Sequence, residues 1–328
     1  MKTKLPEIPY LAFVLLVACT SQILARDANV ESSTRLSHNR RSPANAFNSG
    51  AKPQTDAMLA DSIATLEGYH SIAAELGCRV DLFGKQLGGT GNYREERSGP
   101  FPKVRVELRM PLGEKMGVLV QVCDGRYLWS YRRLLNEEKL TRVDMQRLAQ
   151  ELGSGNDLPL VSPLTSTIGM GGLAGTLREL RRNFHFEVLG ETRLLDEPVW
   201  QLRGRWLPDR LVAILPDQKK AIDSGKEIDY SKLPPHLPSH VMLTLGQEDL
   251  FPYRVEYRRS EIQEGPDGPR DSPEARRSGM VIQFLRVAVN SSIRPAEFDY
   301  NAVDFSDVTE SYIARLKARA AATPKTKP

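Results

Sequence analysis

The clearest pattern along the chain is an alternation of apolar and charged residues between Lys103 and Met110. Every second side chain there is Val, Leu or Met, and Lys, Arg or Glu stand between them, as a strand with one buried and one wet face requires. Two more alternating runs, Val118 to Val122 and Tyr127 to Tyr131, flank Asp124-Gly125, a dipeptide that tolerates the positive φ of a type I′ turn. The sequence therefore predicts a half-buried strand followed by a β-hairpin.

Several other segments have the composition of strands and bring the predicted number to about ten. They are residues 80–83, 93–97, 184–189, 199–206, 241–245, 253–259 and 280–289. Apolar residues spaced by three and four predict helices instead at 56–76, 143–152, 173–182 and 308–319, the last with Asp307 as its N-cap. The proline-rich stretch 207–238 is expected to run over the surface, and the Pro/Gly/charged stretch 265–279 is expected to be a loop between two strands.

Antiparallel strands with one apolar face, together with a few amphipathic helices, place the protein in the α+β class with mainly antiparallel β-structure. Two architectures satisfy this pattern. One is a sandwich of two sheets, and the other is a single strongly curved sheet, or incomplete β-barrel, of about ten strands closed by a few helices. The opening helix favours the second, because its apolar stripe must lie on the inner face of a sheet.

Residues 1–25 have the pattern of a secretory signal peptide. Two lysines precede an apolar run from Tyr10 to Ala18, which is too short to span a bilayer because a span takes about 20 apolar residues. Two cleavage sites compete. Leu16-Val17-Ala18-Cys19 resembles the bacterial lipobox, whose cysteine is acylated and becomes the N-terminus, whereas Ile23-Leu24-Ala25 ends in the small residue that ordinary signal peptidase prefers.

The rest of the chain divides into a tether, one folded domain and a short tail. Residues 26–55 contain so few apolar side chains that they cannot bury enough surface to fold, and they are predicted to be a disordered tether. The folded domain is predicted at 56–317. Residues 318–328 alternate small residues with Lys and Pro and are predicted to be flexible.

The composition argues against several classes of function. Of 328 residues, 45 are Lys or Arg and 41 are Asp or Glu, and no long basic run offers the phosphate-neutralising patch that nucleic-acid binding needs. Mean hydropathy is -0.39, typical of a soluble globular chain. Without Cys19, Cys78 and Cys123 remain as an even pair in an oxidising compartment, and they form either a disulfide or two separate buried thiols.

No motif for catalysis or metal binding stands in a suitable context. Residues 169–174 match the letters of the GxGxx(G/A) dinucleotide fingerprint, but Pro159 and Pro163 interrupt the strand that would have to precede it. His236 and His240 are four residues apart, yet neighbouring prolines forbid the helix that would place both imidazoles on one face. No GxSxG nucleophile elbow occurs. We therefore expect a non-enzymatic monomer without cofactor or metal.

A set of turns and strands carries a resemblance to a known family. These features are the signal peptide, the opening helix, and the segments Gly89-Thr90-Gly91-Asn92-Tyr93, Val104 to Met110, Val122 to Trp129, Gly190 to Leu202, Asp249 to Val255 and Phe298-Asp299-Tyr300. Over about residues 57–316 the chain resembles the LolA-like periplasmic lipoprotein carriers. The resemblance implies an incomplete antiparallel β-barrel, closed on its open side by helices, that holds lipid or lipoprotein acyl chains and serves outer-membrane lipoprotein sorting. The chain is longer than a standard carrier, and a lipid at Cys19 would favour a membrane-anchored receptor or stationary lipid-binding module.

The strand faces and the helical stripe predict where acyl chains would bind. We expect an apolar cavity, because a sheet of ten strands is wider than side chains readily fill. Its predicted lining consists of Val104, Val106, Leu108, Val120, Val122, Trp129, Leu173 and Leu177. The crowded glycines Gly169, Gly171, Gly172 and Gly175 are predicted to form the hinge of a lid helix. The alternative is a secreted or anchored β-rich structural module in which the same residues fill the core.

Lipidation at Cys19 is directly testable in the native host. We expect the intact mass to show an N-terminus at Cys19 carrying several acyl chains, which hold a protein on a membrane far more stably than one chain does. Cys19→Ser should release the protein from the membrane fraction. An unmodified N-terminus at Arg26 would contradict the prediction, and Cys19→Ser would then change nothing.

Overall fold

The computed structural model describes residues 55–82, 85–99, 101–152, 165–234, 237–259, 264–265, 268–269 and 278–322. The predictions for the signal peptide, Cys19 and nearly all of the tether lie outside these residues, as does most of the 265–279 stretch. Within the described ranges, every helix is too short or too polar to qualify as a transmembrane span.

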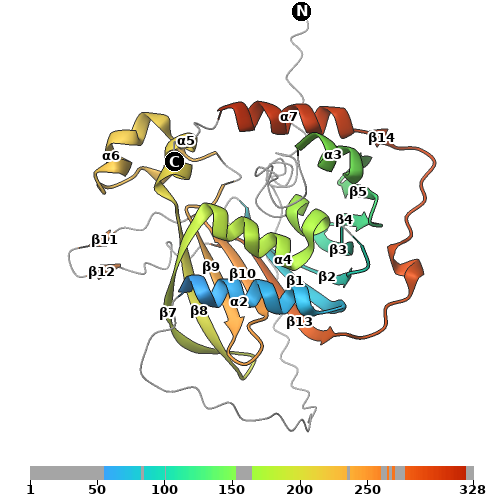
Figure 1. Ribbon diagram of the computed structural model, residues 1–328, viewed down its shortest axis with the longest axis horizontal. Coiled ribbons are helices and arrows are strands. Elements are labelled where there is room, and N and C mark those ends of the chain that lie inside the picture. The colour runs from blue at the N-terminus through green and yellow to red at the C-terminus, as the bar shows by residue number, and fades with distance from the viewer. Residues whose placement is uncertain are drawn as a thin grey trace, which may run out of the picture.

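One sheet of twelve strands forms the body of the molecule (Figure 1). Its strands follow the order β14-β6-β5-β4-β3-β2-β1-β13-β10-β9-β8-β7, and only the β14–β6 pair is parallel. The bounds are β1 (Ser71–Leu82), β2 (Lys85–Glu96), β3 (Lys103–Leu112), β4 (Lys115–Cys123), β5 (Tyr127–Leu134), β6 (Glu137–Asp144), β7 (Phe184–Leu194), β8 (Glu197–Trp206), β9 (His240–Gly246), β10 (Pro252–Arg258), β13 (Ser278–Val289) and β14 (Ser306–Asp307). Strands β11 (Glu264–Gly265) and β12 (Gly268–Pro269) pair separately.

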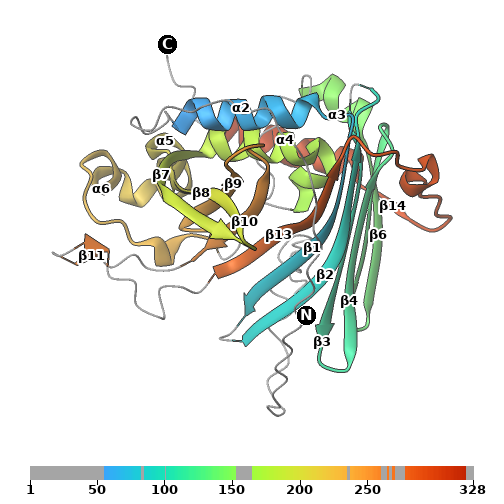
Figure 2. The same cartoon turned by 90° about the horizontal axis from the view of Figure 1, so that it is seen from below.

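The sheet is open and bends into two limbs, with helices across its inner side (Figure 2). The helices are α2 (Thr55–Gly68), α3 (Met145–Leu152), α4 (Thr165–Asn183), α5 (Pro208–Ile214), α6 (Lys219–Asp223) and α7 (Thr309–Ala322). Helix α4 contacts β3 and β4 on one limb and β7 on the other, and α2 packs against α4. The single curved sheet closed by helices is therefore confirmed, and the two-sheet sandwich is excluded.

Close approach between strands explains one of the glycines in β2. A Cβ atom at Gly91 would lie 1.8 Å from the backbone oxygen of Glu107 on β3, so no larger residue fits without moving the strands apart. Glycine in a strand interior often marks such a tight bend or close backbone approach. Gly91 therefore lets β2 and β3 approach closely at this position.

The predicted β-hairpin is confirmed as β4 and β5. The amide of Asp124 donates to the carbonyl of Tyr127 over 3.2 Å, and the Asp124 carboxylate accepts from the amides of Arg126 and Tyr127, each at 2.7 Å. Gly125 has a φ of 95°, while Asp124 is absent from the residues with positive φ. The connection is therefore a carboxylate-stabilised turn with one left-handed residue, not a type I′ turn.

The opening helix is shorter than the sequence predicts. Helix α2 ends at Gly68, and residues 71–76, which were expected to be helical, belong to β1. Every second residue from Ile72 to Val80 is buried, so the operative period there is two. Strand β1 pairs with β2 on one side and β13 on the other. These long-range hydrogen bonds override the local helical spacing.

The proline-rich stretch 207–238 is more structured than predicted. It contains α5, α6 and two 3-10 turns, Pro216–Gln218 and Tyr230–Lys232. Prolines stand at the first positions of α5 and of the first 3-10 turn, where their missing amide hydrogens cost nothing. The stretch buries four side chains in the core, Leu211, Leu215, Ile222 and Leu233. At the far end of the chain, α7 continues to Ala322, beyond the predicted end at 319 and into the predicted tail.

Of the two alternatives for Cys78 and Cys123, the structure has two separate buried thiols and not a disulfide. Both cysteines are buried and free. They lie on β1 and β4 with β2 and β3 between them, which separates them by roughly 14 Å at about 4.8 Å per strand. They also lie at different heights along the strands. Cys78 pairs with Gly89 on β2, whereas Cys123 pairs with Val104 on β3, which in turn pairs with Glu95 on β2. A disulfide needs Cα atoms within about 7 Å of each other.

Both thiols should be unreactive in the folded protein. Burial raises the pKa of Cys78 and of Cys123 to about 12, so almost none of the reactive thiolate is present at mildly alkaline pH. Iodoacetamide followed by peptide mapping should leave both residues unmodified in the native state. After denaturation without reductant, both should be alkylated. A linked pair of peptides, or rapid labelling before denaturation, would contradict this expectation.

Candidate functional site

The candidate site is the inner face of β1–β5 beneath α4. Strand β3 contributes Val104, Val106 and Leu108, none of which is more than 5% exposed. Pairing with β2 places Glu95 beside Val104 and Tyr93 beside Val106. Because residues directly opposite in neighbouring strands share a face, this inner face is apolar apart from a few polar groups.

Five of the eight predicted lining residues meet at this interface. Val104, Val106 and Leu108 come from the sheet, and Leu173 and Leu177 come from α4; all five belong to the main hydrophobic core. They are brought together because the strand alternation and the helical stripe both turn inward where α4 packs on β3. The cavity itself stays a prediction.

The other three predicted lining residues lie on the opposite side of the sheet, which corrects the sequence interpretation. Val122 pairs with Arg105 on β3 and with Trp129 on β5, and Val120 pairs with Glu107 on β3. They therefore share the face of the charged β3 residues. In β4 the more apolar alternating set, Met116, Val118, Val120 and Val122, faces outward, whereas the inward set contains Gly117 and Gln121. The pattern therefore favoured the wrong side.

Residues 291–308, which we term the strap, contact this outer side of β5 and β6. The rings of Trp129 and Phe305 meet edge to face with centroids 5.0 Å apart. The Arg142 guanidinium lies 4.4 Å from the Phe305 ring centroid and binds Asp307 at 2.8 Å. Trp129 is thus buried by the strap and takes no part in the inner site.

Helix α4 is broken at one of the four predicted hinge glycines. Gly172 has φ 63° and ψ -162°, a conformation that leaves α4 as two helical segments joined at this residue. Gly169 approaches Gln121 and Leu128 closely, whereas nothing lies within 4 Å of a Cβ placed at Gly171. Gly175 is similarly open, with only the Arg178 side chain at 4.0 Å. Gly172 is therefore the residue at which the backbone direction changes.

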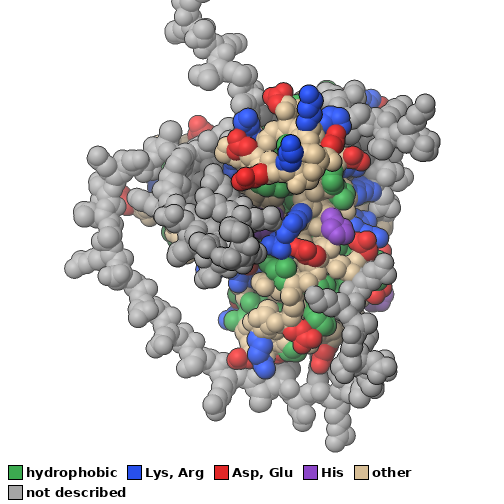
Figure 3. All heavy atoms as spheres, turned by 90° about the vertical axis from the view of Figure 1, so that its left-hand side faces the viewer, with side chains coloured by type: hydrophobic (Ala, Val, Ile, Leu, Met, Phe, Trp, Pro, Cys, Tyr) green, Lys and Arg blue, Asp and Glu red, His purple; other side chains and the backbone are tan. Residues whose placement is uncertain are grey.

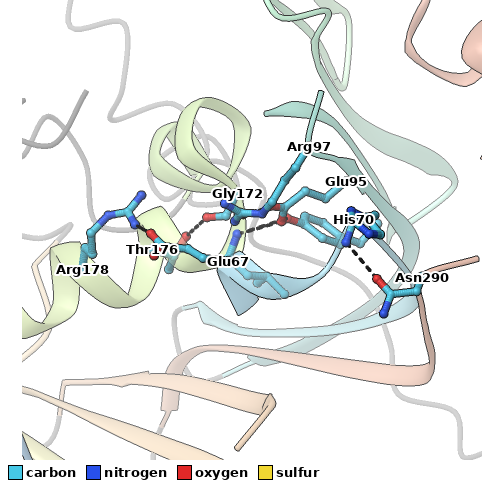
Figure 4. Close-up of polar contacts among 10 residues, drawn as sticks. Glu67, His70, Glu95, Arg97, Gly172, Thr176, Arg178 and Asn290 are labelled. Carbon is cyan, nitrogen blue, oxygen red and sulfur yellow. Dashed lines mark hydrogen bonds and ion pairs between the residues drawn. The ribbon is translucent and has the colours of Figure 1, made fainter. Parts of the chain in front are cut away.

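A buried carboxylate faces this break (Figure 4). Glu95 is fully buried, and its Oε2 accepts a hydrogen bond from the backbone amide of Leu173 at 3.1 Å. The Tyr93 hydroxyl donates to the same carboxylate, and the Arg97 guanidinium binds the other oxygen at 2.7 Å. Negative charge at a helix N-terminus is favourable, since the first amide groups have no partner within the helix. Glu95 thus anchors the second segment of α4.

Tyr93 and Glu95 were not among the predicted site residues. A signal for them was present in the sequence, because residues 93–97 were predicted as a strand, and alternation places positions 93 and 95 on one face. Tyr93 is fully buried as well, and its pKa is raised well above its usual value by burial and by the neighbouring Glu95 charge. The phenol therefore stays protonated and remains a donor to the carboxylate.

Further contacts hold the two segments of α4. The second segment is tied to α2 by an exposed ion pair between Arg178 and Glu67 (Figure 4). Thr176 donates to the carbonyl of Gly172 at 2.9 Å, across the break. The first segment is contacted by α7, where the Tyr312 hydroxyl lies 3.7 Å from the Met170 sulfur. Exposed ion pairs contribute about 0–1 kcal/mol, so the buried Glu95 contact is the stronger anchor.

The described residues do not assemble a metal or nucleophile site. Among them no group of three or more His, Cys, Asp or Glu side chains could hold a metal ion. His236 lies outside the described residues, and His240 is buried, with its pKa lowered to about 4 by burial and by Arg258. Ser239 contacts His240 at 3.0 Å, but both side chains are buried in the protein. On the side seen in Figure 3, the described side chains of both charges are interspersed.

Comparison with known proteins gives matches among solved structures alone. No protein-family model and no curated protein matches the chain. A DUF1329 family protein from Desulfovibrio piger is 12% identical, with 75% of this chain and 97% of that chain covered and a TM-score of 0.34. The lipoprotein LppX from Mycobacterium tuberculosis is 12% identical, with 74% and 99% covered and a TM-score of 0.34.

A LolA superfamily protein from Nitrosomonas europaea is also similar. It is 14% identical, with 75% of this chain and 97% of that chain covered and a TM-score of 0.28.

Replacing Gly172 should destabilise the protein, whereas replacing its neighbour should not. In Gly172→Ala the new Cβ would stand 2.5 Å from the Glu95 carboxylate at a φ that disfavours alanine. We expect a loss of roughly 2–4 kcal/mol in the free energy of unfolding, from strain and overpacking together. Gly171→Ala meets open space and should be neutral or slightly stabilising. Equal denaturation midpoints for the two variants would contradict this account of the break.

Proposed function

We propose that this protein binds the acyl chains of a lipid or lipoprotein between the inner face of β1–β5 and α4, without catalysing a reaction. The observation that carries the proposal is the break in α4 at Gly172, directly over an apolar sheet face. A helix that can pivot at a glycine can uncover that face and cover it again. Acyl chains are the class of ligand that an apolar, buried surface of this kind fits.

The energetics of α4 support a lid that opens without unfolding the domain. Its second segment is held by the buried polar anchor at Glu95, by the exposed ion pair at Arg178 and by apolar contacts, and its last residue, Asn183, accepts a hydrogen bond from the Leu207 amide. The strands beneath it are held by ladder hydrogen bonds on both sides. Segments with few buried anchors open at lower free energy than core strands do. An acyl chain that replaces the lid's leucines on β3 would keep the sheet face dry.

The cellular location is part of the same proposal and is inferred from the signal-peptide pattern of residues 1–25. A signal peptide would export the chain, and a lipid on Cys19 would hold it at the outer membrane by the tether 26–55. A membrane-anchored monomer would act as a receptor or stationary module in lipoprotein sorting, in place of a freely diffusing carrier.

A structural module with a filled core is the second candidate. The tight burial of Val104, Val106, Leu173 and Leu177, each at most 5% exposed, is the observation that favours it. Native mass spectrometry of the mature protein distinguishes the two, because a lipid-binding protein should carry a co-purifying lipid that is released on denaturation.

The variant Val106→Glu tests where the ligand binds. Val106 faces the lid, so a carboxylate there costs several kcal/mol to desolvate unless water enters. If α4 opens, the variant should lose binding of a fluorescent fatty acid at least tenfold while still unfolding cooperatively. Val118→Glu is the matched control, because Val118 pairs with Arg109 and Arg133 on the outer face, and it should bind normally.

Collapse of the fold in Val106→Glu, together with no fatty-acid binding by the unmutated protein, would favour the structural module. Normal binding by Val106→Glu would place the ligand elsewhere.

A further inference from the structure

The Glu95–Arg97 ion pair beneath the break in α4 includes a hydrogen-bond donor that has no partner among the described residues. Arg97 binds Glu95 through Nη2, and its Nε is buried and has no hydrogen-bond partner among the described residues. The side chain of Arg97 is 22% exposed and that of Glu95 is 0% exposed, so the pair runs from the interior toward the surface. A buried donor without a partner is costly and calls for an explanation.

Helix α4 itself supplies a hydrogen-bond donor to Glu95 but no acceptor to Arg97 Nε. The Leu173 amide donates to Glu95 at 3.1 Å and also lies 3.1 Å from the Tyr93 hydroxyl oxygen. When α4 pivots at Gly172, this N–H leaves, and the buried carboxylate loses one of its three donors. A ligand that takes the place of the lid must therefore supply a donor to Glu95, and it gains further if it also supplies an acceptor to Arg97 Nε.

We propose that Glu95 and Arg97 are specificity-determining residues that select acyl chains joined to their polar end through an amide. This inference rests on the proposed function. The N–H of an amide replaces that of Leu173 on Glu95, and the amide carries no charge that Glu95 or Arg97 would repel. Because the N–H and C=O of a trans amide point in opposite directions, the N–H is the group that the Glu95–Arg97 pair selects.

Other polar ends fit the pair less well. An ester offers a carbonyl to Arg97 but leaves Glu95 without a donor. A carboxylate or phosphate would be repelled by the buried Glu95 charge, and an ammonium by Arg97. Hydrogen bonds to charged groups are the stronger kind, so the missing N–H is the larger loss.

The test compares four ligands with the same chain length on the unmutated full-length protein. They are N-methyldodecanamide, methyl dodecanoate, dodecanoate and dodecylamine, each used below its micellar concentration to displace a fluorescent acyl probe at neutral pH. We expect the amide to bind about tenfold or more tightly than the ester, as the loss of one charged hydrogen bond implies. Dodecanoate and dodecylamine should bind no better than the ester.

A pair of variants assigns the selectivity to Glu95. In Glu95→Gln the side chain keeps its shape and an acceptor oxygen but loses its charge, so the advantage of the amide over the ester should fall to a few-fold, and dodecanoate should bind more tightly. Glu75→Gln is the matched control, because Glu75 is on β1, pairs with the exposed Arg286 and points away from α4. It should preserve the full selectivity.

The outcomes separate the two proposals. Equal binding of amide and ester, or tightest binding of dodecanoate, would overturn the amide selectivity and leave acyl-chain binding standing. No displacement by any of the four ligands would remove the proposed function itself. Unchanged selectivity in Glu95→Gln, with thermal unfolding like that of the unmutated protein, would show that another group selects the polar end.

Discussion

The buried carboxylate of Glu95 is the constraint on which the arrangement of the sheet and α4 depends. A carboxylate with no solvent exposure must be given hydrogen-bond donors, and here Tyr93, Arg97 and the Leu173 amide supply them. The amide is available because α4 breaks at Gly172, and the carboxylate can approach because glycine has no Cβ. One interaction therefore fixes where the helix changes direction, where its second segment begins and how closely it packs on the sheet.

The curved sheet surrounds the contact between Glu95 and α4. Strand β1 lies in the middle of the sheet and pairs with β2 on one limb and β13 on the other, so the two limbs bend toward each other around α2 and α4. The apolar inner face collects the main core. The outer face of β5 and β6 has its own aromatic cluster, which the strap covers, while the outer face of β3 carries charged residues.

Local patterns were reliable wherever a single face of an element was apolar. The alternation from Lys103 to Met110 identified β3 and its buried side, and the Asp124-Gly125 turn identified the β4–β5 hairpin. They failed where the more apolar face was not the inner one or where two periods coincided. In β4 the set Met116, Val118, Val120 and Val122 faces outward, and in residues 71–76 the apolar positions matched a helix as well as a strand.

The sequence by itself determined the class of fold, the inward set of β3, the glycine-rich break before Leu173 and the absence of a nucleotide or nucleophile motif, because these follow from short-range spacing. Tertiary structure alone decided that Val120, Val122 and Trp129 face outward, that Cys78 and Cys123 lie three strands apart, and that Glu95 is buried beneath α4. Each of these depends on strand register and order, which are set by contacts between residues far apart in the chain.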